Sequence, residues 1–214
     1  IDDARASRYV TRIVVSTESP DIAAVARECG VEVIDRPPEY ATDEARLDYV
    51  LRHVLETLKE REGYQPDLVV MLAANVPVRE DGIIDRCLEH LVRTGADSVR
   101  TFSSVGKYHP QWSNEIRGDQ VIPYEQLVSY RRQDLTPLYI HDGAVLAVTY
   151  EALADSVNHL DDNFNLFGHD RRGIICSEGS TVEIDGPRDI YAAEAALRMR
   201  AQARLPDRQE KADE

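Results

Sequence analysis

The sequence predicts a Rossmann-like α/β fold, in which a mostly parallel sheet lies between two layers of helices. Short β-branched segments alternate with amphipathic segments through the first half of the chain. Leu68–Leu72 is an unbroken apolar run without the alternation of a half-exposed strand. Such a run is typical of a strand buried on both faces, as in a parallel sheet covered by helices. Repeated strand–helix units imply right-handed crossovers between parallel strands.

The helices of this pattern have recognisable start and stop signals. Ser19 and Pro20 are typical N-cap and first-turn residues, and Gly30 and Gly95 are typical of C-terminal ends. We expect helices over residues 20–29, 42–61 and 81–93 and from 187 onward, and a helix already in progress at residues 1–8. We expect strands at residues 13–17, 31–34, 68–72, 97–102, 144–149, 174–175 and 182–185.

Two polar segments interrupt the pattern. Residues from about 103 to 139 form a first irregular segment, rich in Tyr and Pro, and residues from about 157 to 175 form a second. The first is too long for a plain loop in a compact domain, which indicates a functional or interaction role. Residues 1–204 are predicted to be one domain, and 205–214 a charged tail.

Composition excludes several classes of protein. The net charge is −14, from 25 basic and 39 acidic residues, which argues against a protein that holds a nucleic-acid backbone. No apolar run approaches the roughly 20 residues that span a bilayer. Three widely separated cysteines without a CxxC pattern suggest reduced thiols. We therefore expect a cytoplasmic protein without a membrane segment.

Six motifs occur in an order and spacing that resemble one family, the acylneuraminate cytidylyltransferases. They are Val15–Ser19, Asp35–Asp43, Leu72–Arg79, Arg132–Leu135, Asp142–Ala144 and Val182–Pro187. The resemblance implies a Rossmann-like domain that couples CTP to a sialic-acid-like keto-sugar acid and releases pyrophosphate. It also implies Mg²⁺ as cofactor, and a homodimer formed through an inserted arm made of the irregular segments.

The resemblance gives Asp185, the expected catalytic residue, and Glu183 to the metal. The two lie two residues apart, so on an extended strand both side chains point to one face. Carboxylate oxygens are ligands that Mg²⁺ prefers. The alternative is that Asp185 caps the helix that follows.

The nucleotide site is expected at strand ends. In open α/β sheets ligands bind outside the carboxyl ends of the strands, which places Asn75 and Arg79 at the rim, unless this is an ordinary strand-to-helix turn. The resemblance gives Arg36 to the cytosine edge, whose acceptors suit a guanidinium, and Ala45 to backbone contacts with the same base. The alternative for Arg36 is a solvated surface charge.

The sugar acid is expected to meet a second set of residues. The resemblance gives Arg132 to the substrate carboxylate, because a guanidinium fork matches a carboxylate, with Gln133 ordering the same loop. It gives Asp142 and Gly143 to the sugar, although a simple turn is the alternative for this pair. The adjacent Arg131 is expected to be solvated and not to bind the substrate.

Aromatic and basic residues of the irregular segments remain open between two roles. Lys107, His109 and Trp112 line either a sugar pocket or a dimer contact. Phe164 and Phe167 belong either to an interface or to a small hydrophobic cluster.

The chain also departs from the family pattern. The family's glycine-rich loop, with its Arg and Lys residues, is not in the printed sequence, so we expect an N-terminal strand and loop to be missing before Ile1. Ala73 stands where the family has Gln, and Arg46 and Leu47 stand where it has paired serines. The alternatives are therefore a transferase of the same fold with another sugar or nucleotide, or a non-catalytic binding module.

Overall fold

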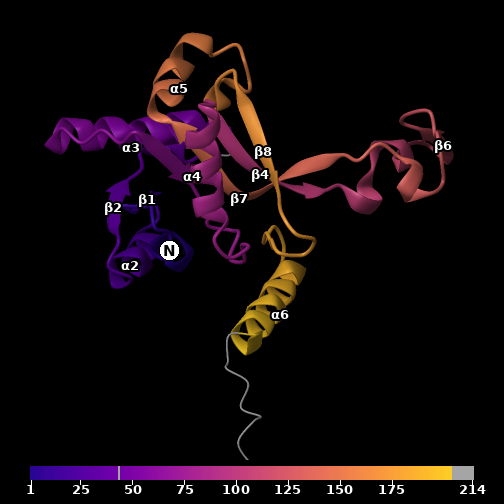
Figure 1. The fold of residues 1–214 in the computed structure, drawn as a ribbon, viewed down its shortest axis with the longest axis horizontal. Helices are drawn as coiled ribbons and strands as arrows, with labels where there is room; N and C mark the ends of the chain where they lie inside the picture. The colour runs from indigo at the N-terminus through magenta and orange to yellow at the C-terminus, as the bar shows by residue number, and fades with distance from the viewer. Residues whose placement is uncertain (43, 204–214) are drawn as a thin grey trace, which may run out of the picture. The chain divides into compact units, whose positions relative to one another are not determined.

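The computed structural model describes residues 1–42 and 44–203 (Figure 1). Contacts between residues divide this chain into two compact units. Unit 1 holds residues 1–73, 79–100 and 145–173. Unit 2 holds residues 74–78 and 101–144 and the chain from 174 onward. The predicted tail, 205–214, lies outside the described residues.

Unit 1 begins with the predicted strand–helix–strand unit. β1 (Val14–Thr17) and β2 (Glu32–Asp35) pair in parallel, with Val15 opposite Val33. The connection is α2 (Pro20–Glu28), whose N-cap Ser19 accepts the N–H of Ile22 at 3.4 Å. A short helix, α1 (Asp2–Arg5), precedes β1. The capping residues and β-branched runs therefore predicted β1, α2 and β2 to within one residue, whereas the helix expected over residues 1–8 already ends at Arg5.

A four-stranded sheet has the order β3-β7-β4-β8. Its strands are β3 (Leu68–Met71), β4 (Ser98–Ser104), β7 (Tyr139–Thr149) and β8 (Arg171–Ile175). β7 runs antiparallel to β3, with Met71 opposite Leu146. The chain reaches β7 through the first irregular segment and not through a helical crossover, so the parallel rule does not apply to it. The α/β class is confirmed, with a mixed sheet.

β7 supplies the centre of the core. Leu146 and Val148 are at most 1% exposed, and they pack with Leu153 of α5 (Tyr150–Asp155). Leu51 and Leu55 of α3 (Leu47–Glu62) pack against the same cluster. Their spacing of four residues places both on one face of the helix, as the apolar stripe predicted.

Two helix boundaries show what the sequence signals could resolve. α3 begins at Leu47 and not at Thr42, because a turn that the Ala45 N–H closes onto the Thr42 carbonyl at 3.0 Å comes first. α4 (Ile83–Thr94) ends, as predicted, at Gly95, which has φ of 65°. A left-handed conformation suits glycine, so that stop signal was specific.

The first irregular segment contains a hairpin that the sequence analysis missed. β5 (Asn114–Arg117) and β6 (Gln120–Pro123) pair antiparallel, and Gly118 in the turn has φ of 68°. Short strands that are mostly exposed show no apolar periodicity from which they could be predicted. Three 3₁₀ turns complete the segment, η2 (Gly106–Tyr108), η3 (Pro110–Trp112) and η4 (Arg132–Asp134).

The C-terminal third needs two corrections. The strand expected at residues 174–175 is longer, because β8 already begins at Arg171, inside the second irregular segment. Residues 182–185 are not a strand, since only Val182 pairs, in an isolated bridge to Val78. The second segment otherwise contains the 3₁₀ turns η5 (Ser156–His159) and η6 (Asn165–Phe167). α6 (Pro187–Ala203) follows as predicted.

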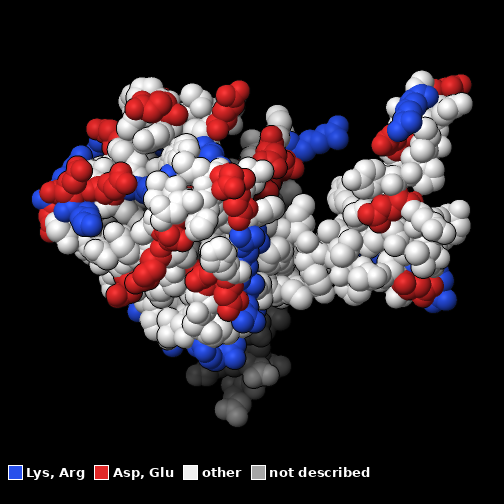
Figure 2. All heavy atoms as spheres, turned by 90° about the horizontal axis from the view of Figure 1, so that it is seen from above, with Lys and Arg blue, Asp and Glu red and all other residues white. Residues whose placement is uncertain are grey.

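The surface agrees with the composition. On the face that Figure 2 shows, Asp and Glu side chains lie scattered among Lys and Arg, without one continuous basic patch. Among the described residues, no helix is both long enough and apolar enough to cross a membrane.

Candidate functional site

The candidate site of unit 2 is built where two extended segments meet. The N–H of Val182 donates to the Val78 carbonyl at 3.2 Å, and the N–H of Ile184 donates to the Asn75 carbonyl at 2.7 Å. These bonds hold residues 182–184 beside residues 75–78. Side chains alternate along an extended segment, so Glu183 and Asp185 share the other face.

Asn75 brings the predicted carboxylates together. Its Nδ2 donates to Glu183 Oε1 at 3.2 Å and to Asp185 Oδ1 at 3.3 Å. Both carboxylates are exposed, and among the described residues neither has an Arg or Lys partner. Two like charges that share one neutral donor favour a bound cation. Two exposed carboxylates offer the oxygen donors that Mg²⁺ prefers, so the residues fit this ion.

At the start of α6 the side-chain hydrogen bonds to the backbone are made by Asp189 and not by Asp185. Asp189, in the first turn of α6, accepts the N–H of Asp185 at 3.0 Å and that of Gly186 at 2.8 Å. The side chain of Asp189 therefore satisfies the backbone at this helix start. The Asp185 carboxylate points instead to Asn75.

Gly143 lies against the same cluster. Its φ is 70°, and a Cβ built on it would lie 3.2 Å from Val76 Cγ2 and 3.6 Å from Glu183 Oε1. The position therefore suits glycine for two reasons, the left-handed backbone and the close approach of Val76. The Glu183 carboxylate therefore lies close to the backbone of residue 143.

Asp142, predicted to contact the sugar, is a buried anchor in this structure. Its carboxylate accepts hydrogen bonds from Thr101 Oγ1 at 2.5 Å, Ser103 Oγ at 3.0 Å and the Ala144 N–H at 3.1 Å. Burial alone raises the pKa of Asp142, but these hydrogen bonds outweigh it and hold the pKa below its usual value. The carboxylate thus fixes the backbone that carries Gly143.

The supporting shell around Asp142 was not predicted from the sequence. Thr101 and Ser103 lie two residues apart on β4, and Thr181 Oγ1 adds a third hydroxyl at 3.3 Å from Asp142. Two hydroxyl residues at a spacing of two on one strand were the available signal, since such side chains share a face.

The adjacent residues Arg131 and Arg132 in unit 2 differ in their contacts. Arg131 Nε lies 3.8 Å from Asp134 Oδ2, so Arg131 is occupied locally. Arg132 is exposed, and the part of the chain that the structure describes gives it no side-chain partner. Gln133 is also exposed in the same 3₁₀ turn, η4. The arrangement leaves the guanidinium of Arg132 available to a carboxylate from outside the protein.

Three predicted nucleotide-binding residues, Arg36, Ala45 and Arg79, lie in unit 1. Arg36 follows β2, and its Nη2 donates to the Ser16 carbonyl at 2.5 Å, while Nη1 lies 3.8 Å from Glu18. Arg36 is thus tied to the carboxyl end of β1 and is half-buried, not fully solvated. Ala45 lies in the turn before α3.

Arg79 is more buried than Arg36 and makes its contacts within the protein. The residue is 6% exposed, its Nη2 donates to the Ala73 carbonyl at 2.6 Å, and its Nη1 lies 3.8 Å from Asp3. These bonds hold the end of β3 in place. Its predicted contact with a nucleotide stays a prediction.

The polar and aromatic residues that were left open in the irregular segments make internal contacts. His109 is buried, and its Nε2 lies 3.1 Å from the Thr136 carbonyl. Trp112 Nε1 donates to the Ser129 carbonyl at 3.2 Å. Phe164 and Phe167 lie with ring centroids 6.2 Å apart. Both His109 and Trp112 thus fasten the two ends of the first segment together.

The α/β fold is that of a nucleotidyltransferase, and the carboxylate pair (Glu183 and Asp185) that Asn75 holds is compatible with that class. A family model described as cytidylyltransferase matches residues 1–140. The chain therefore belongs to the cytidylyltransferase family.

Individual relatives agree with that family. The N-acylneuraminate cytidylyltransferase of Streptococcus agalactiae serotype III (strain NEM316) is 31% identical over 135 residues, which are 62% of this chain and 31% of the relative. The chain thus spans about a third of that protein. The post-translational flagellin modification protein B of Campylobacter coli is 24% identical over 200 residues, 92% of this chain and 82% of the relative.

Solved structures confirm the fold. A CMP:2-keto-3-deoxy-manno-octonic acid synthetase complexed with CTP has a TM-score of 0.65 at 14% identity, covering 93% of this chain and 86% of its own. The 2-C-methyl-D-erythritol 4-phosphate cytidylyltransferase of Thermus thermophilus has a TM-score of 0.54 at 17% identity, covering 91% and 86%.

Proposed function

We propose that this protein is a cytidylyltransferase that activates a sialic-acid-like keto-sugar acid with CTP and releases pyrophosphate. The observation that carries the proposal is the carboxylate pair, Glu183 and Asp185, which Asn75 gathers through two hydrogen bonds. Nucleotidyl transfer depends chiefly on positioning and on neutralising phosphate charge, and this pair suits the task of holding a metal.

The residues of the pair would hold Mg²⁺, which when bound neutralises charge on the phosphates and orients them. Asn75 keeps both carboxylates on one face, and Gly143 lets the backbone approach Glu183 closely. Arg36 would contact the base and Arg132 the carboxylate of the sugar acid. Arg132 supports this role because it is exposed and unpaired among the described residues. Arg131 is also exposed, but it pairs with Asp134.

The sugar is the least constrained part of the proposal. The relative named for an N-acylneuraminate substrate covers 62% of this chain, whereas the flagellin modification protein covers 92% at lower identity. Asp142, which the resemblance gives to the sugar, is buried and bonded to hydroxyls. These facts favour a second candidate, a transferase of the same family that acts on another keto-sugar acid.

The first irregular segment would form a homodimer contact. It exposes apolar side chains along its hairpin and the following loop, with Ile116 66%, Val121 65% and Tyr130 88% exposed. Aromatic side chains are enriched at interfaces, and exposed apolar patches often mark interaction sites.

The deciding experiment is pyrophosphate release by the full-length protein with Mg²⁺. CTP, UTP, ATP and GTP are supplied separately, each with a panel of nine-carbon and eight-carbon keto-sugar acids. Release with CTP and one acid would establish the reaction and name the substrate. Release with another nucleotide would discard the base contact of Arg36. Silence across the panel from folded protein would favour a non-catalytic binding module.

A further inference from the structure

A second group of metal-binding side chains lies in unit 1, on segments that the proposed reaction does not use. Asp155, His159 and His169 each offer one ligand atom, and these atoms all lie within 4.8 Å of one another. Asp155 ends α5, His159 ends η5, and His169 follows η6. We call these three residues the histidine cluster.

Part of the cluster already has the spacing of metal ligands. Asp155 Oδ2 and His159 Nε2 lie 3.1 Å apart. Two ligands at about 2.0 Å from a tetrahedral metal are separated by roughly 3.3 Å. The rings of His159 and His169 are edge-on, with centroids 5.5 Å apart. A small rotation of the His169 side chain would therefore complete a three-ligand site.

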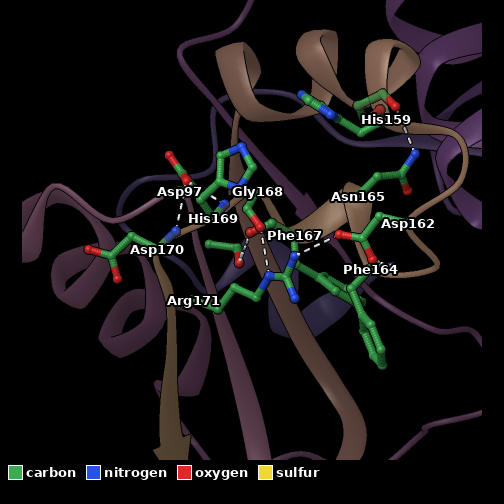
Figure 3. A network of polar contacts seen from close by, with 12 residues as sticks. Asp97, His159, Asp162, Phe164, Asn165, Phe167, Gly168, His169, Asp170 and Arg171 are labelled. Carbon is green, nitrogen blue, oxygen red and sulfur yellow. Dashed lines mark hydrogen bonds and ion pairs between the residues drawn. The ribbon is translucent and has the colours of Figure 1, made fainter.

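The backbone that carries His169 is held firmly. Asp97 Oδ2 accepts the N–H of His169 at 2.7 Å and that of Asp170 at 2.9 Å, and Figure 3 shows Asp97 beside this turn. A Cβ on Gly168 would lie 2.4 Å from Asp97 Cβ, so this close approach needs glycine. A ligand whose backbone is fixed in this way needs little ordering when a metal binds.

The segment that carries His159 is fastened as well. Asn165 Nδ2 donates to the Ser156 carbonyl at 2.7 Å, and Arg46 Nη2 donates to Asn165 Oδ1 at 2.7 Å. Arg46 also donates to the carbonyl of Leu160 at 3.2 Å. Arg46, which stands where the resemblance has paired serines, thus holds the chain between the two histidines with its guanidinium.

The cluster opens onto a cavity of about 250 Å³ with acidic walls. Asp97, Glu151 and Asp162 line it beside the three ligands, and no Lys or Arg is among the described residues that line it. Asp162 is engaged by Arg171 at 3.2 Å, as Figure 3 shows. The negative walls favour a cation over an anion.

We propose that the histidine cluster binds one divalent transition-metal ion of the Zn²⁺ class, with a coordination position open to the cavity. Imidazole nitrogens select Zn²⁺, Co²⁺ or Ni²⁺ over Mg²⁺, which prefers oxygen ligands. The ion would join the end of α5 to the turn at His169 and so stabilise unit 1. This site does not depend on the proposed transferase activity.

The test measures metal binding and not catalysis. Untagged full-length protein is treated with chelator and titrated with ZnCl₂ against a fluorescent competitor. We expect one Zn²⁺ per chain, an affinity lowered at least about tenfold by His159→Gln and by His169→Gln, and no change with His90→Gln. His90 is a matched control because it lies on α4 and its Nδ1 contacts Arg93 at 2.8 Å.

Two further measurements test the same site. Co²⁺ should give visible bands of a nitrogen and oxygen site, without thiolate charge transfer. Zn²⁺ should raise the melting temperature of the parent protein by about 3–5 °C and leave that of His169→Gln unchanged. Absence of one-to-one binding, binding that survives both histidine substitutions, or binding lost in Cys29→Ser would each overturn the proposal.

Discussion

Unit 1 and unit 2 each gather acidic side chains, but the two clusters differ in chemistry. In unit 2, Glu183 and Asp185 offer only oxygen atoms and share one amide donor, Asn75. In unit 1, Asp155 is joined by two imidazoles, His159 and His169. Oxygen donors suit Mg²⁺ and imidazoles suit Zn²⁺, so the two clusters should separate these ions within one chain.

If both clusters bind their proposed ions, the same difference would separate phosphate chemistry from structural support. A magnesium ion keeps several waters and bridges to phosphates, so its carboxylates must face solvent, as the carboxylate pair does. The histidine cluster instead joins segments close in sequence through a turn that Asp97 holds. Cations at these two places would therefore serve a reaction in one case and stability in the other.

The largest effect is expected from Asp185→Ala. Loss of one of two carboxylates should lower kcat for pyrophosphate release by about 100-fold or more, since a metal supplies several kcal/mol to such a reaction. The side chain is exposed, so the melting temperature should change little. His169→Gln is the matched control and should keep the activity with Mg²⁺. Full activity in Asp185→Ala would reject the metal assignment.

Asp142→Ala is expected to have the next largest effect, on stability. The change leaves the Thr101 and Ser103 hydroxyls and the Ala144 N–H without their buried acceptor, so the free energy of unfolding should fall by about 3 kcal/mol. Urea unfolding measures it, with the exposed turn residue Asp119→Ala as control. A loss no larger than that of the control would show that Asp142 is not an anchor.

The same carboxylate should give unit 2 an acid-sensitive contribution. Because the folded pKa of Asp142 is lowered, its stabilisation is present above its unfolded pKa of about 3.9 and is lost as pH falls through the folded value. Asp142→Asn should therefore flatten the fall in stability below about pH 4. The free energy of unfolding of both proteins, measured from neutral pH downward, checks this. An unchanged slope would contradict the lowered pKa.

Arg132→Ala should change substrate binding without changing stability. If its guanidinium binds the carboxylate of the sugar acid, KM for that acid should rise about 10- to 100-fold while KM for CTP stays constant. Arg131→Ala is the control, because Arg131 already pairs with Asp134. Equal effects of the two substitutions would mean that only the local charge matters.

The sequence predicted the scaffold better than the sites. Apolar runs and caps located α2, α4 and β3 to within two residues, because burial and backbone hydrogen bonding act over short stretches. The hairpin of β5 and β6 was missed because its strands are almost entirely exposed. The antiparallel direction of β7 depends on the whole first irregular segment, which has no periodicity.

The candidate sites show the same division between local and distant information. The common face of Glu183 and Asp185 follows from a spacing of two and was predictable. The anchoring of Asp142 by Thr101 joins residues 41 positions apart, and the histidine cluster depends on a turn that Asp97 holds from 72 positions away. Such pairs become neighbours only when the sheet forms, so no local pattern reveals them.

The smallest effect separates backbone strain from crowding at the candidate site. Gly143 and Gly118 have φ of 70° and 68°, but a Cβ at 143 would meet Val76 at 3.2 Å, whereas one at 118 would meet nothing within 4 Å. Both alanine substitutions should cost about 1 kcal/mol of stability for the left-handed backbone. Gly143→Ala should cost up to about 1 kcal/mol more, because Val76 must move. Chemical unfolding of the two variants measures this difference. Equal losses would mean that Val76 yields freely, and that the close packing behind Glu183 does not hold its carboxylate in place.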